Sequence, residues 1–231
     1  MSSSRPTNPN KPTKPTKPTK PSSSSTKPGQ SSSATRKIEE RDYDLNVIAI
    51  RVTIHTTGKF FEDDDRSGNH ASIYLLTSID TSVRLNMTKL GADATMGTFQ
   101  VTYCRYQETN SSLRNFDLTA TSQGLKVGQV LQLVYHNGRD KYQLARSGLG
   151  CRHWVKTVIR DFHGAGFVSS KSRLTTEDAV NGLRYNYSKG KQPVYEEMDP
   201  GTFAADKKKA KGTKGTDTKG TGSGSEPGRR R

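Results

Sequence analysis

Cys151 stands where backbone geometry could turn a thiol into a nucleophile. It follows Gly150 directly and precedes "RHWVKTVIRDFHGAG", in which Trp154, Val155, Val158, Ile159 and Phe162 form one apolar stripe at helical spacing. A helix that begins at Cys151 places the sulfur among unsatisfied N–H groups, at the positive end of the helix dipole. That position stabilises a thiolate and lowers the pKa of the thiol, and Arg152 adds positive charge if it turns the same way.

A thiol nucleophile needs a base, and His70 is the best candidate among five histidines. It opens the strand-like run "HASIYLLT", where its ring could face another element at a sheet edge. We expect His55 to point to solvent, on the face of its strand opposite the alternating isoleucines. His136 and His163 lie at expected helix C-termini, where an imidazolium has a structural reason to be. His153 follows Cys151 by two helical positions and so points away from it.

Asn86 is the candidate orienter of the base. It lies on the run "SVRLNMT", which a short turn at residues 78–81 joins to the strand of His70 as an expected hairpin. In an even register Asn86 and Arg84 share a face with His70 and Ser72, and an Asn86 amide oxygen could accept from one imidazole nitrogen. An odd register turns Asn86 to the opposite face and separates the three residues.

A purely structural explanation also accounts for these residues. Free cysteine is among the most buried residue types, so Cys151 could be a small core residue at a helix junction. Cys104, on the back of the strand expected over "GTFQVTYCRYQ", has no histidine signal and is interpreted as core.

The elements that must position these residues indicate an α+β fold. Strands are expected at residues 45–57, over the hairpin 70–77 and 82–87, and over 97–107. Helices are expected over 125–136, ended by Asn137-Gly138, from 151 onward, and over 175–187. The strands come first and the helices follow without βαβ alternation, which favours an antiparallel sheet packed against a few helices.

Charge divides the chain into a near-neutral domain and two basic tails. The net charge is +15 overall, with +8 in residues 1–37, +6 in residues 204–231 and only +1 between them. Residues 1–40, rich in Lys, Pro, Thr and Ser, and residues 204–231, rich in Lys and Gly, are expected to be disordered, leaving a single globular domain at 41–203. The tails could contact nucleic acid or anionic surfaces weakly.

The stretches "GNHASIYLL", "SVRLNM" and "GCRHWV" carry a resemblance to a known group. Their His–polar–Cys order resembles circularly permuted papain-fold cysteine hydrolases and acyltransferases, the group of lecithin:retinol acyltransferase. The resemblance implies Cys151 as nucleophile, His70 as base and Asn86, rather than Arg84, as orienter. Ala71 stands where an aromatic residue commonly follows the histidine, and Gly150 stands where that group has Asn. More broadly, residues 45–203 resemble a domain family of unknown function found in fungal proteins.

Two classes of function follow from these patterns. The first is a thiol hydrolase or acyltransferase that acts on an amide or ester bond of a small-molecule, peptide or lipid substrate, and its chemistry would need no metal or organic cofactor. The second is a non-catalytic binding module of the same fold; a nucleic-acid-associated protein acting through its tails is a weaker third reading. The sequence has no apolar run of membrane-spanning length, and its two cysteines indicate an intracellular protein, cytoplasmic or nuclear.

Overall fold

A six-stranded antiparallel sheet forms the frame of the domain. The computed structural model describes residues 34–59, 66–91, 94–121, 124–145 and 150–204. Within them the strand order is β1-β5-β4-β3-β2-β6. The strands are β1 (Thr35–Lys37), β2 (Ala49–Lys59), β3 (Ser67–Leu76), β4 (Ser82–Lys89), β5 (Gly97–Cys104) and β6 (Ser112–Thr119). Two short strand pairs accompany the sheet: β7 (Tyr142–Gln143) with β10 (Thr202–Phe203), and β8 (Tyr185–Asn186) with β9 (Val194–Tyr195).

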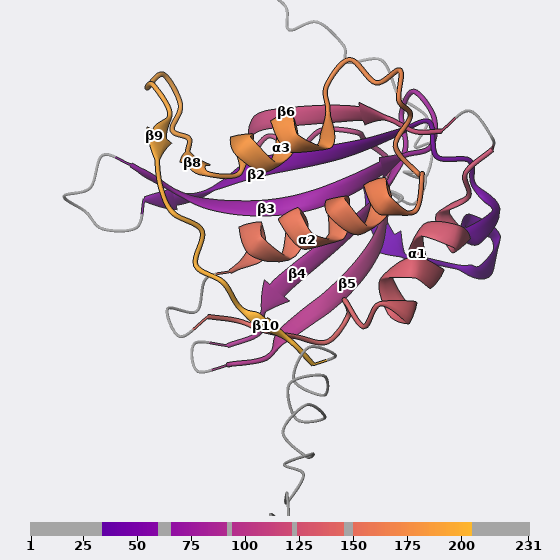
Figure 1. Ribbon diagram of the computed structural model, residues 1–231, viewed down its shortest axis with the longest axis horizontal. Coiled ribbons are helices and arrows are strands. Elements are labelled where there is room, and N and C mark those ends of the chain that lie inside the picture. The colour runs from indigo at the N-terminus through magenta and orange to yellow at the C-terminus, as the bar shows by residue number, and fades with distance from the viewer. Residues whose placement is uncertain (1–33, 60–65, 92–93, 122–123, 146–149, 205–231) are drawn as a thin grey trace, which may run out of the picture. The chain divides into compact units, whose positions relative to one another are not determined.

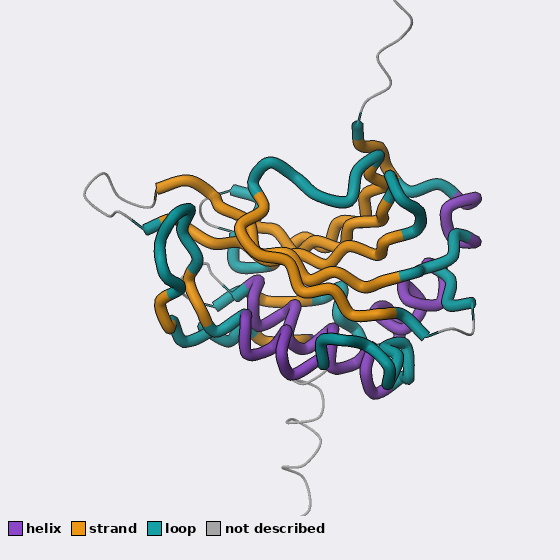
Figure 2. The backbone as a smooth tube through the Cα atoms, turned by 90° about the horizontal axis from the view of Figure 1, so that it is seen from above, coloured by secondary structure: helices purple, strands orange, loops and turns teal. Residues whose placement is uncertain are grey.

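The helices gather on one side of this sheet, as Figures 1 and 2 show from two directions. They are α1 (Val127–His136), α2 (Cys151–Gly164) and α3 (Thr176–Gly182), with a short 3-10 helix η1 (Glu40–Asp44) beside α1. The expected mixture of an antiparallel sheet and helices, an α+β fold, is confirmed. The five residues of the predicted α2 stripe are all fully buried. Burial of large apolar side chains, at roughly 2 kcal/mol each, is what fixes α2 on the sheet.

Alternation along β2, β3 and β4 gives the sheet its helix-facing side. The apolar residues of these three strands that are buried on the helix-facing side are Ile50, Val52, Ile54, Ala71, Ile73, Leu75, Val83, Leu85 and Met87. They join the α1 and α2 stripes in one core. Trp154 lies fully buried in it, and its indole Nε1 donates to the carbonyl of Arg139 at 2.7 Å.

The opposite side of the sheet is also covered, by the β5–β6 connection at residues 105–111. Figure 2 shows a loop on the side of the sheet away from the helices. Arg51 donates to the carbonyl of Gln107 at 3.1 Å, and the Ser82 hydroxyl donates to that of Tyr106 at 2.6 Å. Under this cover lies a second small cluster that includes Tyr74 and Cys104, so Cys104 is the core residue that its sequence position predicted.

Two strands of the six-stranded sheet were not expected from the sequence. β6 reads "SLRNFDLT", in which only Phe116 and Leu118 are buried, too weak an alternation to stand out. β1 pairs with β5 inside the segment assigned to the N-terminal tail, so the paired structure begins at Thr35 rather than at residue 41. Ile48, expected on the buried face of the first long strand, precedes β2 and is exposed. The tails themselves, residues 1–33 and 205–231, lie outside the described residues.

Close packing of α3 on β6 makes Gly182 a sensitive position. A Cβ added there would lie 2.0 Å from Cζ of the Phe116 ring, a distance that forces the ring or the helix to move. We therefore predict that Gly182→Ala lowers the free energy of unfolding by about 1–3 kcal/mol. Gly164→Ala is the matched control, because nothing lies within 4 Å of its added Cβ. Urea unfolding of both variants measures the difference, and equal midpoints would contradict this packing.

Candidate functional site

The candidate site lies where strands β3 and β4 separate. Their ladder pairs Leu76 with Ser82 and Tyr74 with Arg84, and it ends at Ile73 and Leu85. Beyond that rung β4 continues to pair with β5 but no longer with β3. Figure 1 shows the two strands diverging toward the end of the sheet at which α2 begins. The register is the even one, so His70 and Asn86 belong to the same face of the hairpin.

A hydrogen bond between His70 and Asn86 joins the two strands beyond the last rung. The imidazole Nε2 lies 2.6 Å from the Asn86 Oδ1. With the amide oxygen turned to the ring, Nε2 carries the proton and donates, which leaves Nδ1 to exchange a proton with another group. His70 and Asn86, which the even register places on one face, are thus hydrogen-bonded to each other.

Cys151 is the first residue of α2, and the turn before it depends on glycine. Gly150 has a backbone φ of 122°, a conformation that residues other than glycine rarely adopt. Its carbonyl accepts from Trp154 N and from the Tyr142 hydroxyl, both at 3.0 Å. A Cβ on Gly150 would lie 3.0 Å from that hydroxyl oxygen. These contacts fix where the helix starts, and so where the thiol stands.

The Cys151 thiol and the His70 imidazole form a hydrogen-bonded pair. Burial opposes a charge on the thiol, but the hydrogen bond and charge of His70, with smaller contributions from the Ala71 backbone N–H and the charge of Arg152, more than offset it, so the pKa of Cys151 is lowered. Burial likewise opposes a charge on the imidazole, and the contact with Cys151, aided by Asn86, raises the pKa of His70. Both directions favour a thiolate beside an imidazolium.

Arg152 anchors the start of α2 to the segment that follows α3. Its guanidinium is buried and donates to the carbonyls of Leu183 and Tyr185, at 3.3 and 3.4 Å, and it forms an ion pair with Glu196. Its charge is therefore largely engaged in holding this segment. The guanidinium faces these carbonyls and Glu196, although its positive charge still favours the Cys151 thiolate.

The expectation that His55 points to solvent is wrong. Its side is covered by the 105–111 loop, the residue is only 8% exposed, and its ring centroid lies 6.2 Å from that of His70. Nε2 is hydrogen-bonded to the Ser72 hydroxyl at 2.6 Å, and Nδ1 lies 3.2 Å from the Ser111 hydroxyl. Burial, together with the charges of His70 and Arg84, lowers the pKa of His55 to about 4. At neutral pH His55 is therefore an uncharged neighbour of His70.

A cavity of about 200 Å³ opens on this side of the sheet beside His70. All the residues that line it have polar side chains: His55, Thr56, Thr57, His70, Ser72, Arg84, Asn86, Thr109 and Ser111. Arg84, the alternative orienter, contributes to the wall but does not take the place of Asn86 at Nε2. In the sequence, polar residues alternate along β2 and β3. This pattern is the same whether that face lines a polar cavity or meets solvent.

The remaining histidines make contacts of their own. His153 stacks on Tyr142 with ring centroids 6.3 Å apart, while His136 and His163 occupy the last turns of α1 and α2. Among the described residues, no three His, Cys, Asp or Glu side chains are grouped so as to hold a metal ion. The chemistry that this cluster can perform is proton exchange between a thiol and an imidazole whose second nitrogen is held by an amide.

The fold and the site define an α+β domain that carries a Cys–His–Asn cluster at a fork in its sheet. The chain matches a domain of unknown function, DUF7770, over residues 50–204, and it belongs to that family. No curated protein and no solved structure matches it. None of the helices in the described ranges has the length and apolar character needed to cross a membrane.

The two cysteines should differ sharply toward iodoacetamide. The pKa of Cys151 is lowered by its partners, whereas burial raises that of Cys104. We predict that Cys151 is alkylated first and that its rate falls only at a pH below the usual thiol range of about 8.5. His70→Ala should move that midpoint upward by about one unit or more. Peptide mass spectrometry across pH measures both sites, with Cys104→Ser as control, and an unshifted midpoint in His70→Ala would contradict the pairing.

His55 should make the domain sensitive to acid. Its folded pKa of about 4 lies below the usual 6.5, so between these values the unfolded chain binds the proton more readily, and the free energy of unfolding falls as the pH is lowered. We predict that the loss between pH 7 and pH 4.5 is smaller by about 2 kcal/mol in His55→Gln than in the wild type. Urea unfolding at both pH values tests this. The exposed His136→Gln should behave as the wild type.

Proposed function

We propose that this domain is a cysteine-dependent hydrolase or acyltransferase acting on an ester or amide carbonyl, with Cys151 as nucleophile, His70 as base and Asn86 as orienter. The observation that supports it is a single imidazole held between two partners: the amide of Asn86 at 2.6 Å and the thiol of Cys151. A histidine placed only for packing needs neither partner. Nucleophile, base and orienter in series are the arrangement that thiol catalysis requires.

The first half of the reaction would consume the thiolate. The Cys151 sulfur attacks the carbonyl carbon, and the C=O electron pair moves to oxygen to give a tetrahedral oxyanion. When this collapses, the bond to the alcohol or amine breaks, and the leaving group takes the proton from the His70 imidazolium. The product is a thioester on Cys151. The backbone N–H of Cys151, in the first turn of α2, is a donor that such an oxyanion could use.

The second half of the reaction would restore the thiolate. Neutral His70 takes a proton from water, or from an acceptor alcohol or amine, whose oxygen or nitrogen attacks the thioester carbonyl. The C–S bond breaks, the acyl group leaves as acid, ester or amide, and the thiolate returns beside the imidazolium. Asn86 acts through His70, because its amide keeps the ring oriented and Nε2 protonated in both halves.

Kinship with permuted papain-like enzymes is part of the proposal. The order His70, Asn86, Cys151 along a strand, its hairpin partner and a helix start supports it. The two departures from that group have local reasons here. Ala71 is fully buried and its N–H contacts the sulfur, and Gly150 adopts a φ of 122° that Asn would adopt less readily. An intracellular location, and the fungal association of the family resemblance, stay predictions.

Formation of an acyl-enzyme is the decisive test. The full chain is incubated with a series of p-nitrophenyl esters of increasing acyl length, and intact-mass and peptide spectra are recorded alongside nitrophenolate release. We predict a burst close to one equivalent and a thioester adduct on Cys151. His70→Ala should slow acylation by about a hundredfold or more, because it removes the base.

Three variants make the test specific. Cys151→Ala should abolish the burst, Cys104→Ala should leave it unchanged, and Asn86→Ala should shift the pH profile of acylation as well as its rate. If Cys151→Ala still releases nitrophenolate at the wild-type rate, or if no ester acylates the wild type, the domain is the non-catalytic binding module instead.

A further inference from the structure

A second, larger cleft opens at the edge of the sheet, away from the thiol. Its volume is about 790 Å³, within the range of cavities that hold small-molecule ligands. It is lined by the end of β2, the starts of β3 and β6, and residues 187–193 around the β8–β9 turn. Neither Cys151, His70 nor Asn86 contributes to its wall, so an inference about it stands independently of the proposed catalysis.

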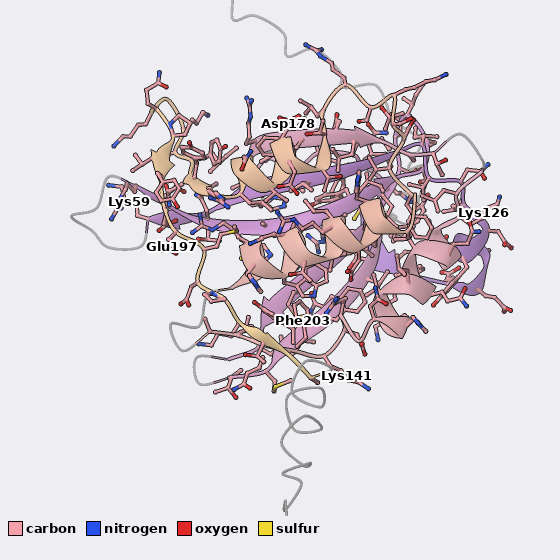
Figure 3. All side chains as sticks on the ribbon, viewed as in Figure 1. Lys59, Lys126, Lys141, Asp178, Glu197 and Phe203 are labelled. Carbon is pink, nitrogen blue, oxygen red and sulfur yellow. The ribbon has the colours of Figure 1, made fainter. Side chains whose placement is uncertain are left out.

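Among the described residues that line this cleft, the charged side chains are all cationic. They are Lys59, Arg114, Lys189 and Lys191. Lys59, Arg114 and Lys189 are exposed, and no salt bridge to them is found within the described ranges. Figure 3 shows Lys59 at the β8–β9 end of the sheet. Cations from three separate segments converge here although the domain between the tails is close to neutral.

Hydrogen bonds fix the segment that closes the cleft. Tyr187 N donates to the Asn69 Oδ1 at 2.6 Å, and the Asn69 amide donates to the Tyr187 carbonyl at 2.8 Å. Ser67 N donates to the Ser188 hydroxyl at 2.9 Å. The wall that carries Lys189 is thus tied to β3, and the cations face the cleft from a fixed frame.

From these observations we infer that the cleft binds a small molecule that carries two or more phosphate groups. Four cations around one cavity match a ligand with several negative charges. Ser188 also lines the wall, and its hydroxyl, which accepts from Ser67 N, can donate its own hydrogen to a phosphate oxygen. Tyr187, Leu113 and Pro193 add apolar surface, which suits an organic portion larger than the phosphates. The volume accommodates a ligand of nucleoside diphosphate size.

Calorimetric titration of the full chain with ADP, and separately with inorganic pyrophosphate, tests this inference. Because the basic tails attract any anion, the comparison is between two variants of equal net charge at about 150 mM salt. Lys59→Gln/Lys189→Gln removes two cleft cations, and Lys89→Gln/Lys171→Gln removes two exposed lysines elsewhere. We expect the cleft variant to weaken ADP binding by about tenfold or more and the control variant by less than about twofold.

Tighter binding of ADP than of pyrophosphate would support a role for the apolar part of the wall. Equal weakening in both double variants would overturn the inference, because the binding would then follow net charge alone. Absence of any binding by the wild type at millimolar ADP and pyrophosphate would also overturn it. Neither result bears on the acylation of Cys151, so the two proposals fail separately.

Discussion

Strand β3 has no β4 partner before Ile73, and the candidate site follows from that gap. A strand that continues without a neighbour leaves backbone donors and acceptors that must be satisfied by other groups. Here side chains supply part of the closure: the His70–Asn86 hydrogen bond joins the two strands, and the sulfur of Cys151 contacts the Ala71 N–H. The opening is held in place by α2, whose buried stripe packs on both strands, and by Gly150, whose φ of 122° sets the start of the helix.

Two histidines that are paired across this sheet have opposite electrostatic character because different groups cover them. His55 and His70 are direct partners in the β2–β3 ladder. His55 lies under the 105–111 loop among hydroxyls, which satisfy a neutral ring, so the pKa falls. His70 faces a thiol that can become an anion, so its pKa rises despite burial. Contact with the Cys151 sulfur therefore distinguishes His70, the candidate base, from the neutral His55.

Sequence patterns predicted the elements well where burial is one-sided. The α2 stripe and the β3–β4 hairpin follow local rules, and α3 begins after Thr175, whose hydroxyl accepts from Asp178 N at 3.1 Å. The His–polar–Cys order predicted that Cys151, His70 and Asn86 lie together, but local patterns do not determine the hairpin register that brings Asn86 to the face of His70. His55 was misassigned because polar alternation looks the same whether a face meets water or a polar loop. The basic cleft brings together residues about 130 positions apart, a proximity that only the fold creates.

The contact between the Cys151 sulfur and strand β3 has an energetic consequence for the proposed reaction. In the proposed acyl-enzyme, the contacts that favour the Cys151 thiolate, those with His70 and the Ala71 N–H, would be weakened because an acylated sulfur carries no charge. The closure of the sheet would then be less complete than before the reaction. A sulfur that is stable as an anion is also a good leaving group, so restoration of these contacts would favour release of the acyl chain. The sheet would then contribute directly to turnover, through the free energy recovered when its gap closes again.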